Sequence, residues 1–171
     1  MDVIVYGHPT LRKKAVPVEA FDAELQAFVE EMSVTMVEKD GVGLAAPQVD
    51  RAVRLFVIDA TQGERPPLVF INPELTWFSD EKEDYEEGCL SIPEIRLNVN
   101  RPVQVTVKAL DINGKPFTVE KAQGLLARAI QHEYDHLEGI MFVDRVSPVQ
   151  RQLVNGKLKR MAKGQKNKKA A

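Results

Sequence analysis

The N-terminal part of the chain contains one segment whose apolar residues recur at helical spacing. After Asp22, every third or fourth position is apolar, at Leu25, Phe28, Val29, Met32, Met36 and Val37. This spacing puts the apolar side chains on one face of a helix, and Asp22 is a suitable N-cap. Gly41 follows as a typical helix end. We therefore expect an α-helix over about residues 22–39 that buries this face.

The middle of the chain is rich in short apolar and β-branched runs instead of helical periods. Five such runs predict strands, over residues 53–60, 67–75, 85–92, 103–110 and 116–122. The last two flank the turn sequence DING, which predicts a β-hairpin. Because the strands are consecutive and helices flank them, we expect an α+β fold. In it, antiparallel strands pack around a central helix, with further helices towards both termini.

Two helices are expected after the last strand. The first begins near Leu125, contains the stretch QHEYDHLEG (residues 131–139) and ends at Gly139. The second begins after Ser147 and Pro148. The final KGQKNKKAA is expected to be frayed or disordered, because it has almost no apolar residue to bury. We expect one catalytic domain over residues 1–162 and a basic tail over residues 163–171.

Composition limits the class of protein. At 171 residues, with 44% apolar and 28% charged residues, the chain fits one globular domain with a real core. It has no run of about eighteen apolar residues and no basic segment followed by a long apolar one, so neither a membrane span nor a secretory signal is expected. The lone cysteine, Cys89, excludes an internal disulfide, and we expect a reducing, cytoplasmic setting.

Charge is distributed unevenly along the chain. The net charge is only −2, but residues from 151 onward include eight Lys or Arg and no acid. The first 150 residues hold all twenty-five acidic residues and fifteen basic ones, a balance of −10. Basic segments of this kind often bind nucleic acid or another anionic surface.

The stretch QHEYDHLEG carries the clearest candidate chemistry. On a helix, His132 and His136 are four residues apart and lie on one face, where two imidazoles can bind one metal ion. Glu133 lies next to the first histidine, so its carboxylate can reach a water on that metal. The helix supports this reading, because Leu126 and Ile130 share a stripe with Glu133. Burying a carboxylate without a partner costs several kcal/mol, and a metal explains why one is there.

A catalytic site usually has three protein ligands, so a third is needed. In the extended pattern H-E-x-x-H-x-x-G-x-x-H, Gly139 is in place, but Phe142 occupies the last position. No glutamate follows Glu138, and His8 lies in a Gly-Pro-flanked segment and is expected to be structural or exposed. The sequence EGCLS (87–91) offers Cys89, whose thiolate is a strong ligand for zinc or iron. We therefore expect Cys89 to complete the site.

Three motifs together resemble a known family. GVGLAAPQ (41–48), EGCLS and QHEYDHLEG, in this order and at these separations, resemble the signature motifs of peptide deformylase, and the resemblance covers essentially the whole chain. It implies a metal-dependent hydrolase that removes the formyl group from the N-terminal formyl-methionine of nascent polypeptides. A metal-bound water would attack the formyl carbon, with Glu133 as general acid/base. The implied metal is one divalent ion, natively Fe²⁺, and Zn²⁺, Ni²⁺ or Co²⁺ could occupy the same site.

The resemblance also assigns roles to residues by motif. Cys89, His132 and His136 are implied as metal ligands. The backbone N–H of Leu90 and the side-chain amide of Gln48 are implied to hold the formyl oxygen as negative charge develops on it.

Further residues are expected around the substrate. Gly43 would leave room for an extended peptide, and Val42 would line the methionine pocket. Leu125 and Arg96 complete the predicted substrate-binding set. Arg128 is expected at the mouth of the cleft.

Around the metal site, a contact between Glu87 and Arg101 is expected to orient the site, and Asp135 has no assigned role. The C-terminal helix of the family further suggests that the basic tail contacts the ribosome.

Two alternatives stay open from the sequence. The H-E-x-x-H pattern alone also fits a metalloprotease-like peptidase. A binding module with a structural metal is the other alternative, although structural sites normally have four protein ligands and only three are convincing here.

Overall fold

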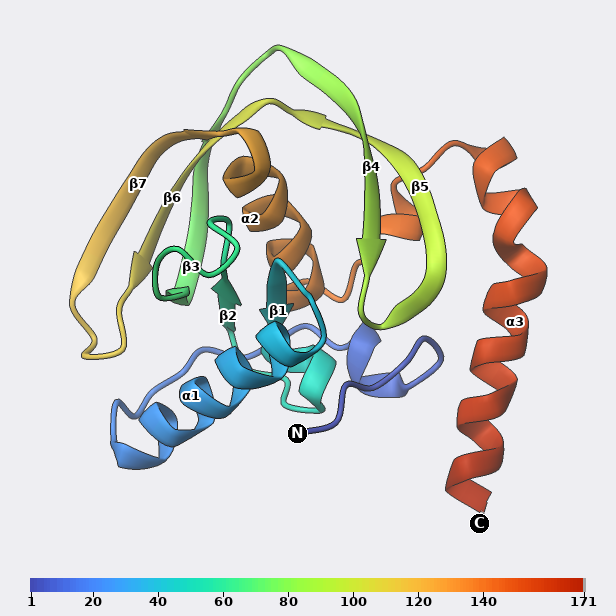
Figure 1. Cartoon of the computed structure of the whole chain (residues 1–171), viewed down its shortest axis with the longest axis horizontal. Helices are drawn as coiled ribbons and strands as arrows, with labels where there is room; N and C mark the ends of the chain where they lie inside the picture. The colour runs from blue at the N-terminus through green and yellow to red at the C-terminus, as the bar shows by residue number, and fades with distance from the viewer. Residues whose placement is uncertain (171) are drawn as a thin grey trace.

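The computed structural model describes residues 1–170 and has the expected α+β architecture (Figure 1). Its first helix, α1 (Ala23–Glu38), begins where Asp22 Oδ1 accepts a hydrogen bond from the Leu25 N–H at 2.9 Å. The predicted apolar face packs in a cluster with Leu44, Leu55 and Ile71 of the neighbouring strands. Val37 is the exception, because it lies in the last turn and is 55% exposed.

Five antiparallel strands form the larger sheet, in the order β1-β2-β3-β6-β7. Their bounds are β1 Gly43–Ala45, β2 Leu55–Ile58, β3 Leu68–Phe78, β6 Gln104–Leu110 and β7 Pro116–Gln123. The predicted hairpin is confirmed, since Leu110 pairs with Pro116 at its closed end. The edge strand β1 was not predicted. Its residues belong to GVGLAAPQ, whose glycines and proline indicated a loop.

A second sheet pairs β4 (Lys82–Cys89) with β5 (Ile92–Pro102). The predicted strand over residues 85–92 corresponds to β4, but it was placed too late and ran into the following turn. Strand β5 was missed, although Ile95, Leu97 and Val99 alternate with polar residues as in a half-buried strand. This hairpin matters for function because its turn, between Cys89 and Ile92, lies beside the candidate site.

The helix that carries QHEYDHLEG, α2 (Gly124–Leu137), lies between the two sheets in Figure 1. It contacts β1, β2, β6 and β7 of the larger sheet, and ion pairs join it to β4 and β5. Ten of its fourteen residues are buried, including His132, Glu133, Asp135 and His136. A helix enclosed in this way holds its polar side chains at fixed positions.

The last helix, α3 (Pro148–Ala170), lies at the side of the molecule next to β5 (Figure 1). Val154 and Leu158 are buried in a cluster with residues of β5 and of the N-terminal segment. The helix continues through residue 170, whereas we expected residues 163–171 to be frayed or disordered; residue 171 lies outside the described part of the chain. The continuation has a physical reason, because no proline interrupts these residues and Lys, Gln and Ala propagate a helix well. The domain boundary at residue 162 stays a prediction.

Three short 3₁₀ helices complete the structure: η1 (Pro9–Arg12), η2 (Ala46–Val49) and η3 (Phe142–Asp144). His8 caps η1, where its Nδ1 accepts a hydrogen bond from the Thr10 N–H, so it has the structural role expected of it. No helix in the described residues combines the length and apolar character that a membrane crossing requires.

Candidate metal centre

The three predicted ligands come together from two elements. Cys89 lies at the end of β4, and His132 and His136 lie one turn apart on α2. One ligand atom from each residue lies within 4.8 Å of the others, and Cys89 Sγ is 3.4 Å from His136 Nε2. One sulfur and two imidazole nitrogens form a donor set typical of zinc or iron.

The orientation of His132 is set by a buried carboxylate. Glu87 Oε1 lies 2.8 Å from His132 Nδ1, which leaves Nε2 as the free ring nitrogen. Metal-binding histidines usually have such a partner on their other nitrogen. Arg101 donates two hydrogen bonds to Glu87 and one to Asp135, so Glu87 is itself held in place. The expected contact between Glu87 and Arg101 is confirmed.

Glu87 is anionic despite its burial. Burial acts to raise its pKa, but hydrogen bonds from His132 and Arg101 outweigh this effect and lower the pKa of Glu87 to about 2. Arg128 adds a further hydrogen bond to Glu87 at 3.0 Å, and it also donates to the Val99 carbonyl. Arg128 is therefore buried in this network, and the expectation that it lies at the cleft mouth was wrong.

Two buried polar atoms have no hydrogen-bond partner among the described residues: Glu133 Oε2 and His136 Nδ1. Leaving a carboxylate oxygen buried and unsatisfied costs about 1–3 kcal/mol or more, and protein side chains normally avoid it. An unsatisfied carboxylate beside three ligand atoms fits a site that holds a cation together with a water or a substrate. The residues present thus fit a single divalent metal ion.

Burial and neighbouring groups shift the pKa values of His132, His136 and Glu133. Among the protein's own groups, burial raises the pKa of Glu133 to about 7 and lowers the pKa of His136 well below its usual value. Burial also acts to lower the pKa of His132, but hydrogen bonds to Cys89 and Glu87 outweigh it and raise that pKa. Metal binding at these residues competes with protonation of the His132 ring.

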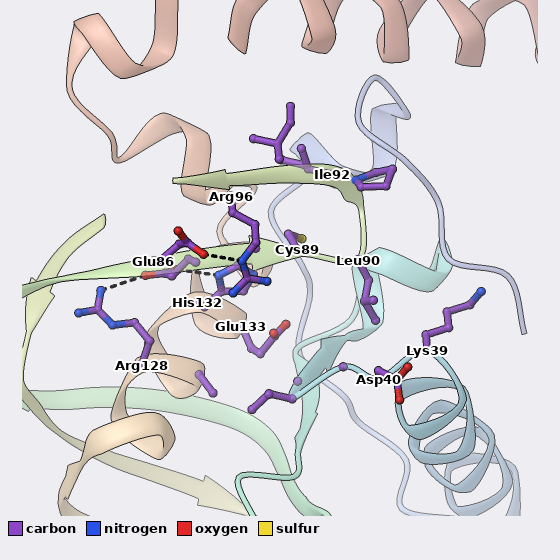
Figure 2. Close-up of a pocket in the computed structure, with 18 of the residues that line it drawn as sticks. Lys39, Asp40, Glu86, Cys89, Leu90, Ile92, Arg96, Arg128, His132 and Glu133 are labelled. Carbon is purple, nitrogen blue, oxygen red and sulfur yellow. Dashed lines mark hydrogen bonds and ion pairs between the residues drawn. The ribbon is translucent and has the colours of Figure 1, made fainter. Parts of the chain in front are cut away.

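A cavity of about 610 Å³ opens beside these residues (Figure 2). Of the ten predicted site residues, all except the predicted ligand His136 line it: Val42, Gly43, Gln48, Cys89, Leu90, Arg96, Leu125, His132 and Glu133. Lys39 and Asp40, at the end of α1, border the cavity on one side in Figure 2. This volume is within the range of small-molecule and peptide side-chain sites, about 300–1,000 Å³.

Gln48 is held close to the ligand thiol. Its Oε1 accepts a hydrogen bond from the Ala45 N–H at 2.8 Å, and its Nε2 lies 3.2 Å from Ser91 Oγ and 3.4 Å from Cys89 Sγ. Ser91, which is fully buried, was missed by the sequence analysis. It belongs to EGCLS, but its contact with Gln48 joins two motifs 43 residues apart.

Gly43 packs directly against Glu133. A Cβ at this position would lie 2.6 Å from Glu133 Oε1, closer than any real Cβ contact. From the sequence, Gly43 is expected to leave room for a peptide, and its packing against Glu133 is a second reason for a glycine here.

Arg96 lies at the rim of the cavity, where it donates to Glu86 Oε1 at 2.8 Å. Both side chains are more than half exposed, at 63% and 60%. The positive charge of Arg96 is therefore accessible from the cavity mouth but already has an exposed, acidic partner. Glu86 was not singled out from the sequence.

Comparisons with known proteins agree with this geometry. The polypeptide deformylase family model matches residues 1–152. The chain is 48% identical over 163 residues to a peptide deformylase of Chromohalobacter salexigens, covering 95% of this chain and 94% of the relative. It is 42% identical over 171 residues to that of Acinetobacter baumannii, covering 100% and 97%.

Solved structures give the same result. The chain resembles peptide deformylase 1B of Arabidopsis thaliana in complex with an inhibitor, with a TM-score of 0.95, 37% identity and coverage of 100% of this chain and 95% of that one. It resembles a peptide deformylase from Legionella pneumophila with a TM-score of 0.88, 43% identity and 96% coverage of both chains. The chain therefore belongs to the polypeptide deformylase family, metallohydrolases that remove the formyl group from the N-terminal methionine of nascent polypeptides.

Proposed function

We propose that deformylation by this chain uses Cys89, His132 and His136 as metal ligands and Glu133 as general acid/base. The observation that carries this assignment is the Glu133 carboxylate, buried beside the three ligands with Oε2 unsatisfied. A divalent ion held by one thiolate and two neutral imidazoles supplies a Lewis acid that polarises the formyl carbonyl and acidifies water. We propose Fe²⁺ as the native ion, with Zn²⁺, Ni²⁺ or Co²⁺ able to replace it.

Glu133 moves the protons of the reaction. With a pKa raised to about 7 by burial, its carboxyl group can accept a proton from the attacking water and later return it to the leaving amine. A general acid/base works best with a pKa near the working pH; burial raises the pKa of Glu133 in that direction, and a bound cation would act in the opposite direction. The contact of Gly43 with its carboxylate keeps Glu133 in one position.

Gln48 and Leu90 stabilise the developing negative charge on the formyl oxygen. The Gln48 amide is nearly fully buried and is fixed by Ala45 and Ser91, so its Nε2 is aimed beside the ligand thiol before substrate arrives. Leu90 lines the same cavity one residue after Cys89, which allows its backbone N–H to act with Gln48. One such donor contributes about 3–4 kcal/mol to transition-state stabilisation.

The substrate lies along the cavity wall made by β1 and the β4–β5 turn. Because β1 is the edge of its sheet, its free edge can pair with an extended peptide at Gly43. Val42 and Leu125 offer apolar surface to the methionine side chain, and Arg96 at the rim can meet the peptide backbone or its carboxylate. The formyl carbon carries only hydrogen, so a narrow site can admit it and reject larger acyl groups.

We further propose that the basic C-terminal segment contacts the ribosome, in the cytoplasm where nascent chains appear. Lys157, Lys159, Arg160, Lys163 and Lys166 are exposed on α3, which fits an anionic partner. Removal of residues 163–171 should then lower co-sedimentation with ribosomes at low salt, while turnover of a short formyl-Met peptide is unchanged. Equal co-sedimentation of both forms would remove this part of the proposal.

The assigned reaction is tested with protein prepared anaerobically and analysed for metal. Formyl-Met peptides should release formate, whereas unformylated peptides with cleavable internal bonds should stay intact. Internal cleavage would instead identify a peptidase. A fourth protein ligand found by metal spectroscopy would indicate a structural site, although the described residues bring together only three.

A further inference from the structure

A second cavity lies on the other face of α2. Its volume is about 320 Å³, and its wall includes Gln131, Tyr134 and Asp135 of α2 and the C-cap residue Glu138. These positions repeat at helical spacing, and the residues of α2 that face the metal cavity occupy different positions, including 129, 132 and 133. The two cavities therefore lie on separate faces of one helix, and none of the proposed metal or substrate contacts uses the second.

The charges around this cavity do not balance. Asp135 accepts hydrogen bonds from Arg101 at 2.9 Å and from two nitrogens of Arg145 at 2.8 Å each. Glu87 accepts hydrogen bonds from Arg101 and Arg128. Glu87 and Arg128 line the metal cavity, whereas the wall of the second cavity carries three cationic groups, Lys82, Arg101 and Arg145, and two carboxylates, Asp135 and Glu138, which is an excess of one positive charge.

Additional cationic groups face the same space. Lys82 lines the cavity and forms no ion pair within the described residues, and Arg145 Nη1 forms no hydrogen bond there. The remaining acid of the wall, Glu138, is already paired with Arg54 and Lys14. The cavity thus offers Lys82, whose charge has no partner among the described residues, and one unused nitrogen of Arg145, whose charge is already paired with Asp135.

Five apolar residues and two uncharged polar ones, Asn100 and Gln131, form the rest of the wall. Leu75, Phe78, Pro102, Tyr134 and Ile140 line it, and Phe78 is 46% exposed. Small-molecule sites combine apolar surface with convergent polar groups, and this cavity has both; its volume is at the lower end of the range for such sites, about 300–1,000 Å³. We propose that this cavity binds a small amphipathic anion, with a carboxylate at Lys82 and Arg145 and an apolar body against Phe78 and Tyr134.

The position of the cavity gives such a ligand a path to the metal centre. Asp135 holds Arg101, Arg101 holds Glu87, and Glu87 holds His132 at 2.8 Å. If a bound anion pulls the Arg145 guanidinium away from Asp135, the electrostatic environment of Arg101 changes, because both arginines donate hydrogen bonds to that carboxylate. Binding should therefore alter the environment of the His132 ring without entering the metal cavity.

The proposal is tested by NMR on the full chain, labelled with ¹⁵N and loaded with zinc. The probe is 3-phenylpropionate, and 3-phenylpropanamide is its neutral control. We expect saturable shifts at the backbone amides of Phe78, Tyr134 and Arg145, with a Kd on the order of 1 mM. The amide should bind at least about tenfold more weakly, because it lacks the charge-assisted hydrogen bonds. The His132 ring signals should shift with the same saturation curve.

Variants identify the groups that bind the probe. Lys82→Met and Arg145→Met should each raise the Kd by about tenfold, whereas Lys108→Met, which removes an exposed lysine elsewhere, should leave it unchanged. Lys82 is exposed, so its variant should fold even if the loss of Arg145 destabilises the protein. Shifts centred on Val42, Gly43 and Leu90 would show binding in the metal cavity and overturn the proposal. Equal affinity for the amide, or no effect of Lys82→Met, would overturn it as well.

Discussion

Glu87 Oε1 lies 2.8 Å from His132 Nδ1, in a place where both side chains are almost fully buried. This one contact fixes which ring nitrogen of His132 faces the metal centre, and it links the centre to Arg101 and Arg128. The metal site is therefore supported by a charged network and not by its three ligands alone. Such outer contacts orient the ligands and raise their basicity.

Replacing Glu87 should weaken metal binding. In Glu87→Gln the negative charge beside His132 is lost, and the affinity for Zn²⁺ should fall about 10–100-fold, as measured by competition with a chromophoric chelator. Glu86→Gln is the matched control, because Glu86 is the neighbouring residue and is exposed. If both variants bind Zn²⁺ with the affinity of the parent, Glu87 does not support the centre.

Gly43→Ala should reduce turnover without unfolding the protein. The added methyl group would collide with the Glu133 carboxylate, so Glu133 has to move, and misplacement by about 1 Å can cost about 10²-fold in rate. Gly164→Ala is the control, since a Cβ there meets nothing within 4 Å. The measurement is kcat for a formyl-Met peptide at equal metal content. A normal kcat would show that Glu133 tolerates the displacement.

Cys89 should be protected from alkylation while metal is bound. A thiolate that ligates a metal reacts slowly, and chelation should expose it as the only thiol of the chain. Labelling followed by mass spectrometry gives the rates before and after chelation. Cys89→Ser should also bind metal more weakly, because a hydroxyl is a poorer ligand than a thiolate. Equal labelling rates with and without metal would argue against ligation.

Asp144 should make stability depend on pH in the acidic range, at and below about 3.8. Burial acts to raise its pKa, but hydrogen bonds from Arg12 and the Met141 N–H outweigh it and lower the pKa of Asp144 below its ordinary value of 3.8. Because the folded-state pKa is lowered, this stabilisation is present above pH 3.8 and is lost as the pH falls through the folded-state value.

Asp144→Asn should consequently lower the free energy of unfolding at pH 7 by up to about 1 kcal/mol, the scale of partly exposed ion pairs. The difference from the parent should shrink as the pH is lowered below 3.8, as measured by urea unfolding at a series of pH values. Asp80→Asn, at an exposed position, is the control. A difference that stays constant down to low pH would exclude this ionic contribution.

The elements that could be predicted from the sequence are those with a regular spacing of apolar residues or a recognisable turn. The stripe of α1, the hairpin of β6 and β7, and the position of α2 all follow from local spacing and turn residues. Strand β1 was missed because its glycines and proline indicate a loop, and it becomes a strand only by pairing with β2. Helix α3 runs to Ala170 although residues 163–170 have little apolar surface, because Lys, Gln and Ala have high helix propensity; whether this end frays stays a prediction.

The site residues that lie within short sequence motifs could be predicted, and contacts between distant motifs could not. Cys89 could be inferred because no other ligand was left, and the structure brings it to both histidines. The contact between Gln48 and Ser91, the burial of Arg128 and the packing of Gly43 on Glu133 depend on elements far apart in the chain. For Ser91 the sequence offered one indication. It is a polar residue inside the motif EGCLS, and a buried polar side chain needs a hydrogen-bond partner.

The central claim is that Glu133 carries protons for metal-dependent deformylation. Its most direct test is formate release by Glu133→Gln and Glu133→Ala at a metal content shown to equal that of the parent. We expect retained metal and a fall in kcat of about 10²–10⁴-fold for a formyl-Met peptide. Near-normal formate release by either variant, with its metal site intact, would exclude Glu133 as the group that carries the protons.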